Sequence, residues 1–161
     1  MHIYSDVRVP CVHSVYEELR SGCAVNLYGS FRRNKDAKSF MVELLSRSAA
    51  VMVLEFDLTH SEIRAFSAST AGVDRLKAFN FDFKQIRRFH LHISVSDSYF
   101  DIEMNGTFIG CFIPVGDIRT VTNDEKNSDH VSLRTMKDDI ISAFPGLVIH
   151  DSDVGRIFLD Q

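Results

Sequence analysis

The sequence predicts an all-β protein built as an antiparallel sandwich or barrel. Apolar and polar residues alternate with a period of two along several segments, which is typical of half-buried strands. These segments follow one another with short connections and without helical patterns between them, which favours antiparallel pairing. The pair Asn105-Gly106 lies between two of the segments and favours a type I′ hairpin turn, because both residues readily adopt positive φ.

Seven segments carry the alternating pattern and are the predicted strands. In chain order they are residues 24–29, 39–44, 51–58, 62–67, 89–95, 100–104 and 107–113. In the second of these, Phe40, Val42 and Leu44 share one face. In the third, Leu54 and Phe56 share one face in the same way. These apolar faces are expected to line the core.

Two segments show a different pattern. Residues 12–20 favour one or two helical turns. Near the C-terminus, Met136, Ile140, Ile141 and Phe144 recur at helical spacing, and Pro145-Gly146 then ends the pattern. We therefore predict a β-sandwich domain over residues 1–134 and a short helical or mixed C-terminal extension over residues 135–161, which packs on the sandwich.

Composition limits the classes of partner and compartment. The 161 residues carry 18 Lys and Arg against 22 Asp and Glu, a net charge of −4, which disfavours nucleic-acid binding. There is no apolar run long enough for membrane insertion and no signal-peptide pattern. The three cysteines are widely spaced, which favours reduced thiols rather than a disulfide framework. We expect a protein that is cytoplasmic, or secreted without a signal peptide.

Short patterns of signature residues occupy the predicted strands in a fixed order. They are an alternating apolar stretch bounded by Gly22 and Gly29, Phe40-Met41-Val42-Glu43-Leu44, Leu54-Glu55-Phe56-Asp57-Leu58-Thr59, Phe83 with Phe89 six residues later, Phe89-His90-Leu91-His92-Ile93, and Asn105-Gly106-Thr107-Phe108. In this order and spacing the patterns resemble those of the galectin family, the soluble β-galactoside lectins. The resemblance implies a galectin-like antiparallel β-sandwich of the jelly-roll or concanavalin-like type.

The same resemblance implies that the usual sugar site is degenerate. Where galectins carry a His, an Asn and an Arg alternating on one outer face, this chain carries Glu55, Asp57 and Thr59. The stacking Trp of the family falls near Val73, the Glu that follows it falls at Arg75, and the chain contains no tryptophan. An apolar sugar face needs an aromatic platform, and carboxylates accept hydrogen bonds but donate none. We therefore expect lactose-type binding to be lost or very weak.

The candidate ligand-binding residues are the degenerate sugar-site positions and one neighbouring carboxylate. They are Glu43, Glu55, Asp57, Thr59, Val73 and Arg75. Alternation places the three carboxylates on the non-core side of neighbouring strands, so they could form an acidic groove for a basic peptide, an amino sugar or a cation. The alternative is an ordinary solvated face whose carboxylates pair with Arg47 or Arg64.

The favoured function is a non-catalytic, galectin-like binding module for a protein partner or a non-standard glycan, with a possible homodimer through a sheet edge. We predict no catalytic residue, no cofactor and no metal. His90 and His92 have a spacing that suits metal binding, but the spacing specifies no further ligand. One alternative is a true lectin with a reshaped pocket.

Two further alternatives come from other classes of protein. His92-Ile93-Ser94 and His130-Val131-Ser132 resemble the paired elements of two-histidine phosphoesterases, in which the histidines act as general acid and base. Residues 110–121 resemble part of the small barrel of bacterial protease adaptors.

Overall fold

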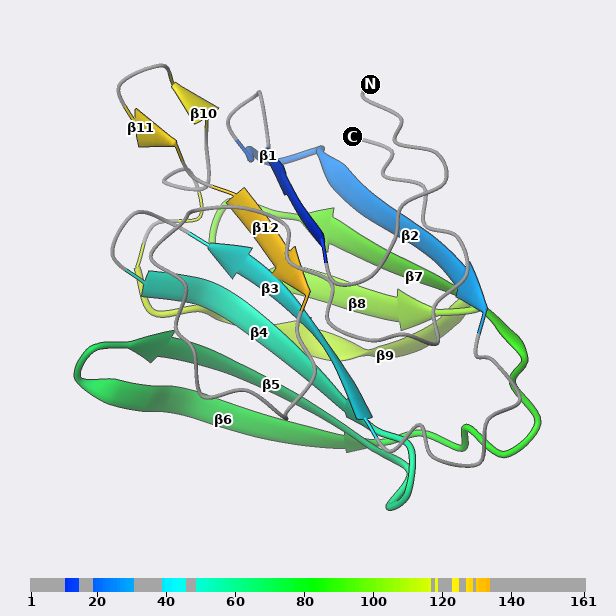
Figure 1. The fold of residues 1–161 in the computed structure, drawn as a ribbon. Helices are drawn as coiled ribbons and strands as arrows, with labels where there is room; N and C mark the ends of the chain where they lie inside the picture. The colour runs from blue at the N-terminus through cyan, green and yellow to red at the C-terminus, as the bar shows by residue number, and fades with distance from the viewer. Residues whose placement is uncertain are drawn as a thin grey trace.

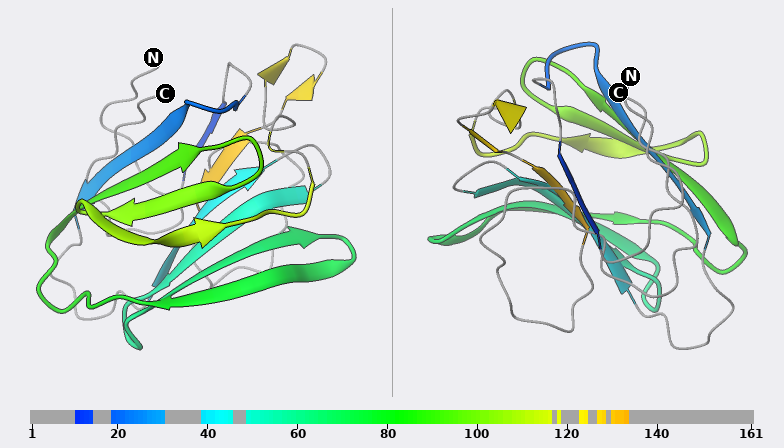
Figure 2. Two further views of the ribbon diagram at one scale, coloured as in Figure 1. Left: turned by 180° about the vertical axis from the view of Figure 1, so that it is seen from behind. Right: turned by 45° about the horizontal axis from the view of Figure 1, so that its top comes forward.

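Two antiparallel sheets stacked face to face make up most of the part of the chain that the structure describes (Figures 1 and 2). The computed structural model describes residues 11–14, 19–30, 39–45, 49–116, 118, 123–124, 127–128 and 130–133. These residues contain no α-helix, and so no helix among them is long and apolar enough to cross a membrane. The predicted sandwich is therefore confirmed, and the barrel of the adaptor alternative is wrong because the strands form separate sheets.

The larger sheet has six strands in the order β1-β12-β3-β4-β5-β6. Their bounds are β1 Cys11–Ser14, β3 Ser39–Leu45, β4 Ala49–Asp57, β5 Glu62–Ser69, β6 Gly72–Asn80 and β12 His130–Leu133. Strand β1 pairs with β12 along its whole length, so the expected helical turn is wrong at 12–14. The predicted extension over residues 135–161 lies outside the described residues.

The smaller sheet has four strands in the order β2-β7-β8-β9. Their bounds are β2 Ala24–Ser30, β7 Arg88–Val95, β8 Phe100–Met104 and β9 Thr107–Phe112, and a separate short pair consists of β10 Asn123–Asp124 and β11 Asn127–Ser128. Asn105 and Gly106 join β8 to β9 with φ values of 52° and 74°. The predicted turn with two positive φ angles is thus confirmed.

The core lies between the sheets and is filled by the alternating apolar residues. Phe40 and Phe56 stack with their ring centroids 4.0 Å apart, and Phe89 from the other sheet stacks on Phe40 at 5.4 Å. Leu91, Ile93, Ile102 and Met104 are fully buried from the smaller sheet. Burying such side chains contributes about 1.5–3 kcal/mol each, so the faces seen in the sequence set which side of each strand points inward.

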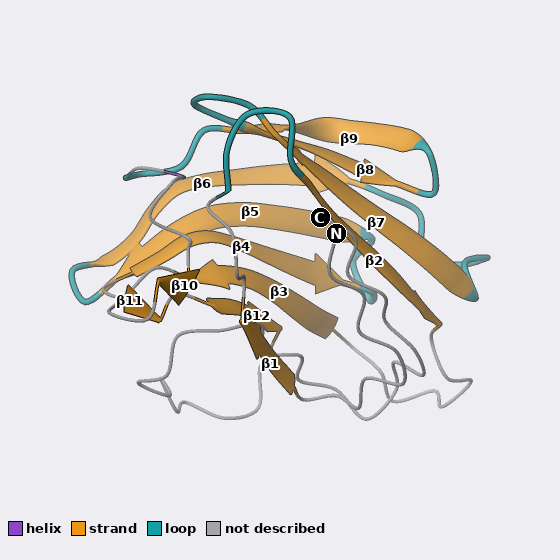
Figure 3. Ribbon diagram, turned by 90° about the horizontal axis from the view of Figure 1, so that it is seen from above, coloured by secondary structure: helices purple, strands orange, loops and turns teal. Residues whose placement is uncertain are grey.

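Strands β6 and β9 are edge strands of the two sheets and lie at the same side of the sandwich (Figure 3). Side chains of β6 connect the two sheets there. Lys77 Nζ donates to the carbonyl of Cys111 at 2.9 Å, and its ammonium lies 5.3 Å from the ring centroid of Phe79. The ring of Phe79 in turn packs directly against Gly110 of β9. Lys77 and Phe79 of β6 therefore face β9 and do not lie on the outer face of the larger sheet.

Candidate functional site

The outer face of the six-stranded sheet carries the predicted carboxylates. In the antiparallel registers Glu55 of β4 lies opposite Met41 on β3 and opposite Arg64 on β5, and Asp57 lies opposite Glu62. Residues directly opposite each other share a face, and these alternate with buried core residues. Glu55, Asp57 and Glu62 therefore surround Arg64 on one outer surface.

Arg64 is the centre of this cluster. Its Nη1 lies 3.3 Å from Glu55 Oε1, its Nη2 lies 3.8 Å from Asp57 Oδ2, and its Nε donates to Glu62 Oε1. The hydrogen bond to Glu62 and then the charge of Glu55 raise the pKa of Arg64 above its usual range. The guanidinium stays charged, so three carboxylates and one cation leave the cluster with an excess of negative charge.

Asp57 also organises the turn between β4 and β5. Its Oδ1 accepts the backbone N–H groups of Thr59 at 3.0 Å and His60 at 2.9 Å, and its Oδ2 lies 2.8 Å from His60 Nδ1. Burial acts to raise the pKa of Asp57. The hydrogen bonds from His60, the charge of His60 and the backbone hydrogen bond from Thr59 together hold the pKa below its usual value. Thr59 thus enters the site through its backbone.

Replacing Asp57 by asparagine is expected to lower the stability of the protein at neutral pH. The variant should then lose less stability than wild type when the pH is lowered. Because the pKa of Asp57 in the folded protein lies below its ordinary 3.8, the carboxylate contributes stability above that value, and this contribution is lost as the pH falls through the lowered pKa. Urea unfolding of wild type and Asp57→Asn at neutral pH and near pH 3 measures the effect.

The matched control for Asp57 is Asp82→Asn, because Asp82 Oδ1 accepts the backbone N–H of Lys84 at 2.9 Å in an exposed turn. We expect the gap between wild type and Asp57→Asn to narrow in acid, and the Asp82→Asn gap to change less. A gap for Asp57→Asn that stays constant or widens in acid would contradict the assignment.

A second apolar cluster lies on the same outer face. Leu45, Ala50 and Val53 are buried there, and Met41, Phe66 and Ala68 pack against them. Glu43 and Glu55 of this face are only 7% and 6% exposed. The alternative of a freely solvated face is therefore wrong for these two carboxylates, although its pairing of Glu55 with Arg64 is confirmed. Arg47 lies outside the described residues.

Comparison with known proteins identifies the family. No family model matches the chain. The chain is 30% identical over 126 residues to the probable galaptin lec-8 of Caenorhabditis elegans, covering 75% of this chain and 69% of that protein. The chain belongs to the galectin family. It is also 25% identical over 111 residues to the probable galaptin lec-7 of the same organism, covering 68% of this chain and 61% of that relative.

Solved galectin structures share the fold. Galectin LEC-6 of Caenorhabditis elegans matches with a TM-score of 0.72 and 13% identity, over 99% of this chain and 96% of that chain. Sheep galectin-11, solved in complex with glycerol, matches with a TM-score of 0.61 and 12% identity, over 96% of both chains. The resemblance drawn from the strand patterns is thus confirmed at the level of family and fold.

The two candidate residues of β6 lie apart from the Arg64 cluster. Val73 is opposite Ala68 at the far end of the hairpin from Glu62, and it is 62% exposed. Arg75 adopts a φ of 53° where the register shifts, and its Nη1 donates to the carbonyl of Ile113 at 3.5 Å. At the bulge the side chain of Arg75 therefore points toward Ile113, and Arg75 does not contact the carboxylates of the Arg64 cluster.

Leu76 is a site-face residue that the sequence reasoning missed. It lies two residues before Ala78, which is opposite Arg64, so both residues face the same outer surface. Leu76 is 62% exposed. The outer face of the six-stranded sheet therefore carries the exposed aliphatic residues Val73 and Leu76 on β6. Residues 72–80 show no regular alternation, because the bulge at Arg75 interrupts it, and so the pattern did not predict a strand here.

The two-histidine phosphoesterase alternative is wrong. His92 lies on β7 in the four-stranded sheet, whereas His130 begins β12 in the six-stranded sheet. His92 alternates with the buried residues Leu91 and Ile93, so it points away from the core that separates the sheets. Histidines on different layers, one of them on an outer face, cannot act as acid and base on one phosphate.

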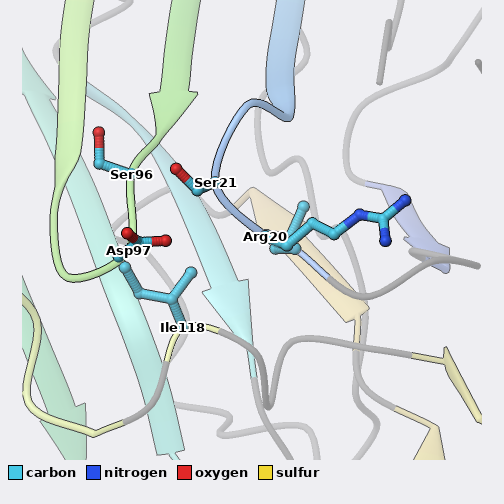
Figure 4. Close-up of a pocket in the computed structure, with 6 residues that line it drawn as sticks. Arg20, Ser21, Ser96, Asp97 and Ile118 are labelled. Carbon is cyan, nitrogen blue, oxygen red and sulfur yellow. The ribbon is translucent and has the colours of Figure 1, made fainter.

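A cavity of about 270 Å³ opens at one end of the sandwich, between the turn that precedes β2 and the β7–β8 turn (Figure 4). Ser21, Ser96, Asp97 and Ile118 surround it, and the guanidinium of Arg20 extends away from it. Typical small-molecule sites enclose about 300–1,000 Å³. This cavity is slightly smaller than that range and shares no residue with the Arg64 cluster.

Proposed function

We propose that this galectin-family chain is a non-catalytic binding module that has exchanged β-galactoside binding for recognition of a cationic group, presented by a basic segment of a protein partner. The observation that supports the proposal is the Arg64 cluster, which occupies the face and the strand positions where the family resemblance expects sugar ligands. Glu55 and Asp57 stand at two of those positions and both interact with Arg64.

Lactose has little to bind on this face. Galactoside hydroxyls need both donors and acceptors, and the two carboxylates on β4 only accept. Arg64 donates hydrogen bonds to Glu55 and Glu62 and forms an ion pair with Asp57, so its guanidinium is already directed at carboxylates. At the position of the stacking aromatic residue the chain has Val73, whose branched side chain cannot replace a flat ring.

A cationic group has a suitable counterpart here. Glu62 and Asp57 retain 29% and 16% of their side-chain exposure, so a Lys or Arg side chain from a partner can reach their oxygens. The exposed aliphatic residues Val73 and Leu76 on the adjacent strand offer an apolar contact to the same partner. Charge-assisted hydrogen bonds to carboxylates are about twice as strong as neutral ones.

Two titrations of the full chain test the proposal. We expect no submillimolar binding of lactose, and we expect binding of an oligo-arginine peptide but not of an oligo-glutamate peptide of equal length. Glu62→Gln should weaken peptide binding, whereas the control Glu103→Gln, on the outer face of the other sheet, should leave it unchanged. Submillimolar lactose binding, or equal effects of the two variants, would overturn the proposal.

A second candidate is a lectin with a reshaped pocket, and Phe66 is the observation that favours it. Phe66 lies opposite Val53 on the site face and is half-buried in the second apolar cluster. It supplies an aromatic ring on the strand beside β6. A glycan array that contains neutral galactosides and unacetylated amino sugars separates the two candidates, because only the lectin should bind neutral glycans and lose that binding in Phe66→Ala.

Self-association through a sheet edge stays a prediction. Strand β6 is the accessible edge of the larger sheet, but the bulge at Arg75 and the charged Lys77 both disfavour the addition of another strand there.

A further inference from the structure

The outer face of the four-stranded sheet carries a polar cluster that the proposed function does not use. Asn26 lies opposite His92, and Tyr28 lies opposite His90, across the β2–β7 pair. Glu103 of β8 lies opposite His92 on its other side. Their chain neighbours on these strands are buried in the core, so the five side chains share one outer surface.

Two imidazole nitrogens converge on a single point of this surface. His90 Nε2 and His92 Nδ1 each lie 2.7 Å from the same atom, Asn26 Oδ1. The ring of His90 is held in place by Tyr28, which stacks on it at a centroid distance of 4.2 Å and an interplanar angle of 5°. A two-residue spacing on a strand predicts a shared face, and the structure adds the convergence and a neighbouring oxygen.

We propose that His90 and His92 form a binding site for a divalent transition-metal ion of the zinc or copper class, with Asn26 Oδ1 as an oxygen ligand. Imidazole nitrogen suits Zn²⁺ and Cu²⁺, whereas Ca²⁺ and Mg²⁺ prefer sites built from oxygen. The ion would lie between the two nitrogens, and the Asn26 amide would shift so that Oδ1 coordinates it. Water completes the coordination.

Binding of the ion requires only a shift of a proton within each imidazole ring. In the tautomers that donate to Asn26 Oδ1, each neutral imidazole carries its proton on the nitrogen that would bind the ion, and this proton moves to the other ring nitrogen. Metal binding needs the neutral form of each ring, and the tautomer shift leaves the lone pair of the binding nitrogen directed at the ion.

The number of protein ligands limits the strength of the site. Among the described residues no group of three His, Cys, Asp or Glu side chains is arranged to hold an ion. The site thus has two strong ligands and one amide oxygen, in contrast to the four ligands of a structural zinc site. An exchangeable surface ion is expected, and Cu²⁺ should bind more tightly than Zn²⁺.

Calorimetric titration of the tag-free chain with Zn²⁺, Cu²⁺ and Mg²⁺ tests the proposal. We expect a site for Zn²⁺ and Cu²⁺ that Mg²⁺ does not occupy, with affinity reduced about tenfold or more in His90→Gln and in His92→Gln. His60→Gln is the matched control, because His60 is an exposed histidine that contacts Asp57 on the other sheet. It should bind both ions as wild type does.

A second measurement on the wild-type chain keeps the proposal testable if a variant fails to fold. On addition of Zn²⁺ the imidazole NMR signals of His90 and His92 should shift together, and that of His60 should not. Unchanged affinity in both variants, or Zn²⁺-induced shifts that spare His90 and His92, would overturn the proposal.

Discussion

Replacing Arg64 by leucine is expected to destabilise the protein by about 2–4 kcal/mol. The substitution removes the cation beside Glu55, whose side chain is 8% exposed, and leaves that carboxylate buried beside Asp57 and Glu62. Breaking a fully buried pair from one side costs about 3–5 kcal/mol. We take a lower value because the side chain of Arg64 is 34% exposed, so water screens part of the interaction.

A double variant separates the charge effect from the loss of packing. In Arg64→Leu with Glu55→Gln the buried charge is absent, so we expect the second change to recover part of the stability lost in the first. Arg88→Leu is the control, because Arg88 is an exposed strand residue, and such changes usually stay within about 0.5 kcal/mol. Urea unfolding measures all four chains. Equal effects of Arg64→Leu and Arg88→Leu would show that the cluster contributes no stability.

The strands with one buried face were predictable from the sequence, because burial on one side imposes a period of two. Strand β7 shows this most clearly, with Phe89, Leu91 and Ile93 buried and His90 and His92 facing outward. The β8–β9 turn was predictable for a local reason, since Asn105 and Gly106 both tolerate positive φ.

Strand β6 gave no such signal. It is an edge strand that is exposed along most of its length, so few of its residues are constrained to be apolar. Its alternation is also broken by the bulge at Arg75, which moves Leu76 to the outer face. Strand β1 was missed for a different reason, because its four residues are too few to show a period.

The carboxylate face was predictable, but its surroundings were only partly so. Alternation placed Glu55 and Asp57 together, and it left Arg64 as one of two possible partners. The second apolar cluster was missed because burial of Val53 on the outer face and of Leu54 on the inner face produces a continuous apolar run. Such a run does not indicate which side is covered, since that depends on contacts from other strands.

Replacing Gly110 by alanine is expected to destabilise the protein by about 1–3 kcal/mol, the range for overpacked cores. A Cβ at this position would lie 2.3 Å from Cε1 and 2.9 Å from Cδ1 of Phe79. The ring would have to move away from β9. Its movement would disturb Lys77, which contacts the ring and donates to the Cys111 carbonyl beside Gly110. The connection between the two edge strands would loosen.

A double-mutant cycle with Phe79→Ala tests this cause. Once the ring is absent the added methyl group has space, so Gly110→Ala should cost less in the Phe79→Ala background than in wild type, with a coupling of about 0.5–3 kcal/mol. Gly110 also has a positive φ of 159°, which adds a backbone cost that does not depend on the ring. Gly106→Ala is a useful contrast, because a Cβ there meets no atom within 4 Å and its φ of 74° leaves backbone strain as the cost. That cost should be the same with and without Phe79. If the cost of Gly110→Ala were also independent of Phe79, the close approach of β6 and β9 would not be the reason for glycine at this position.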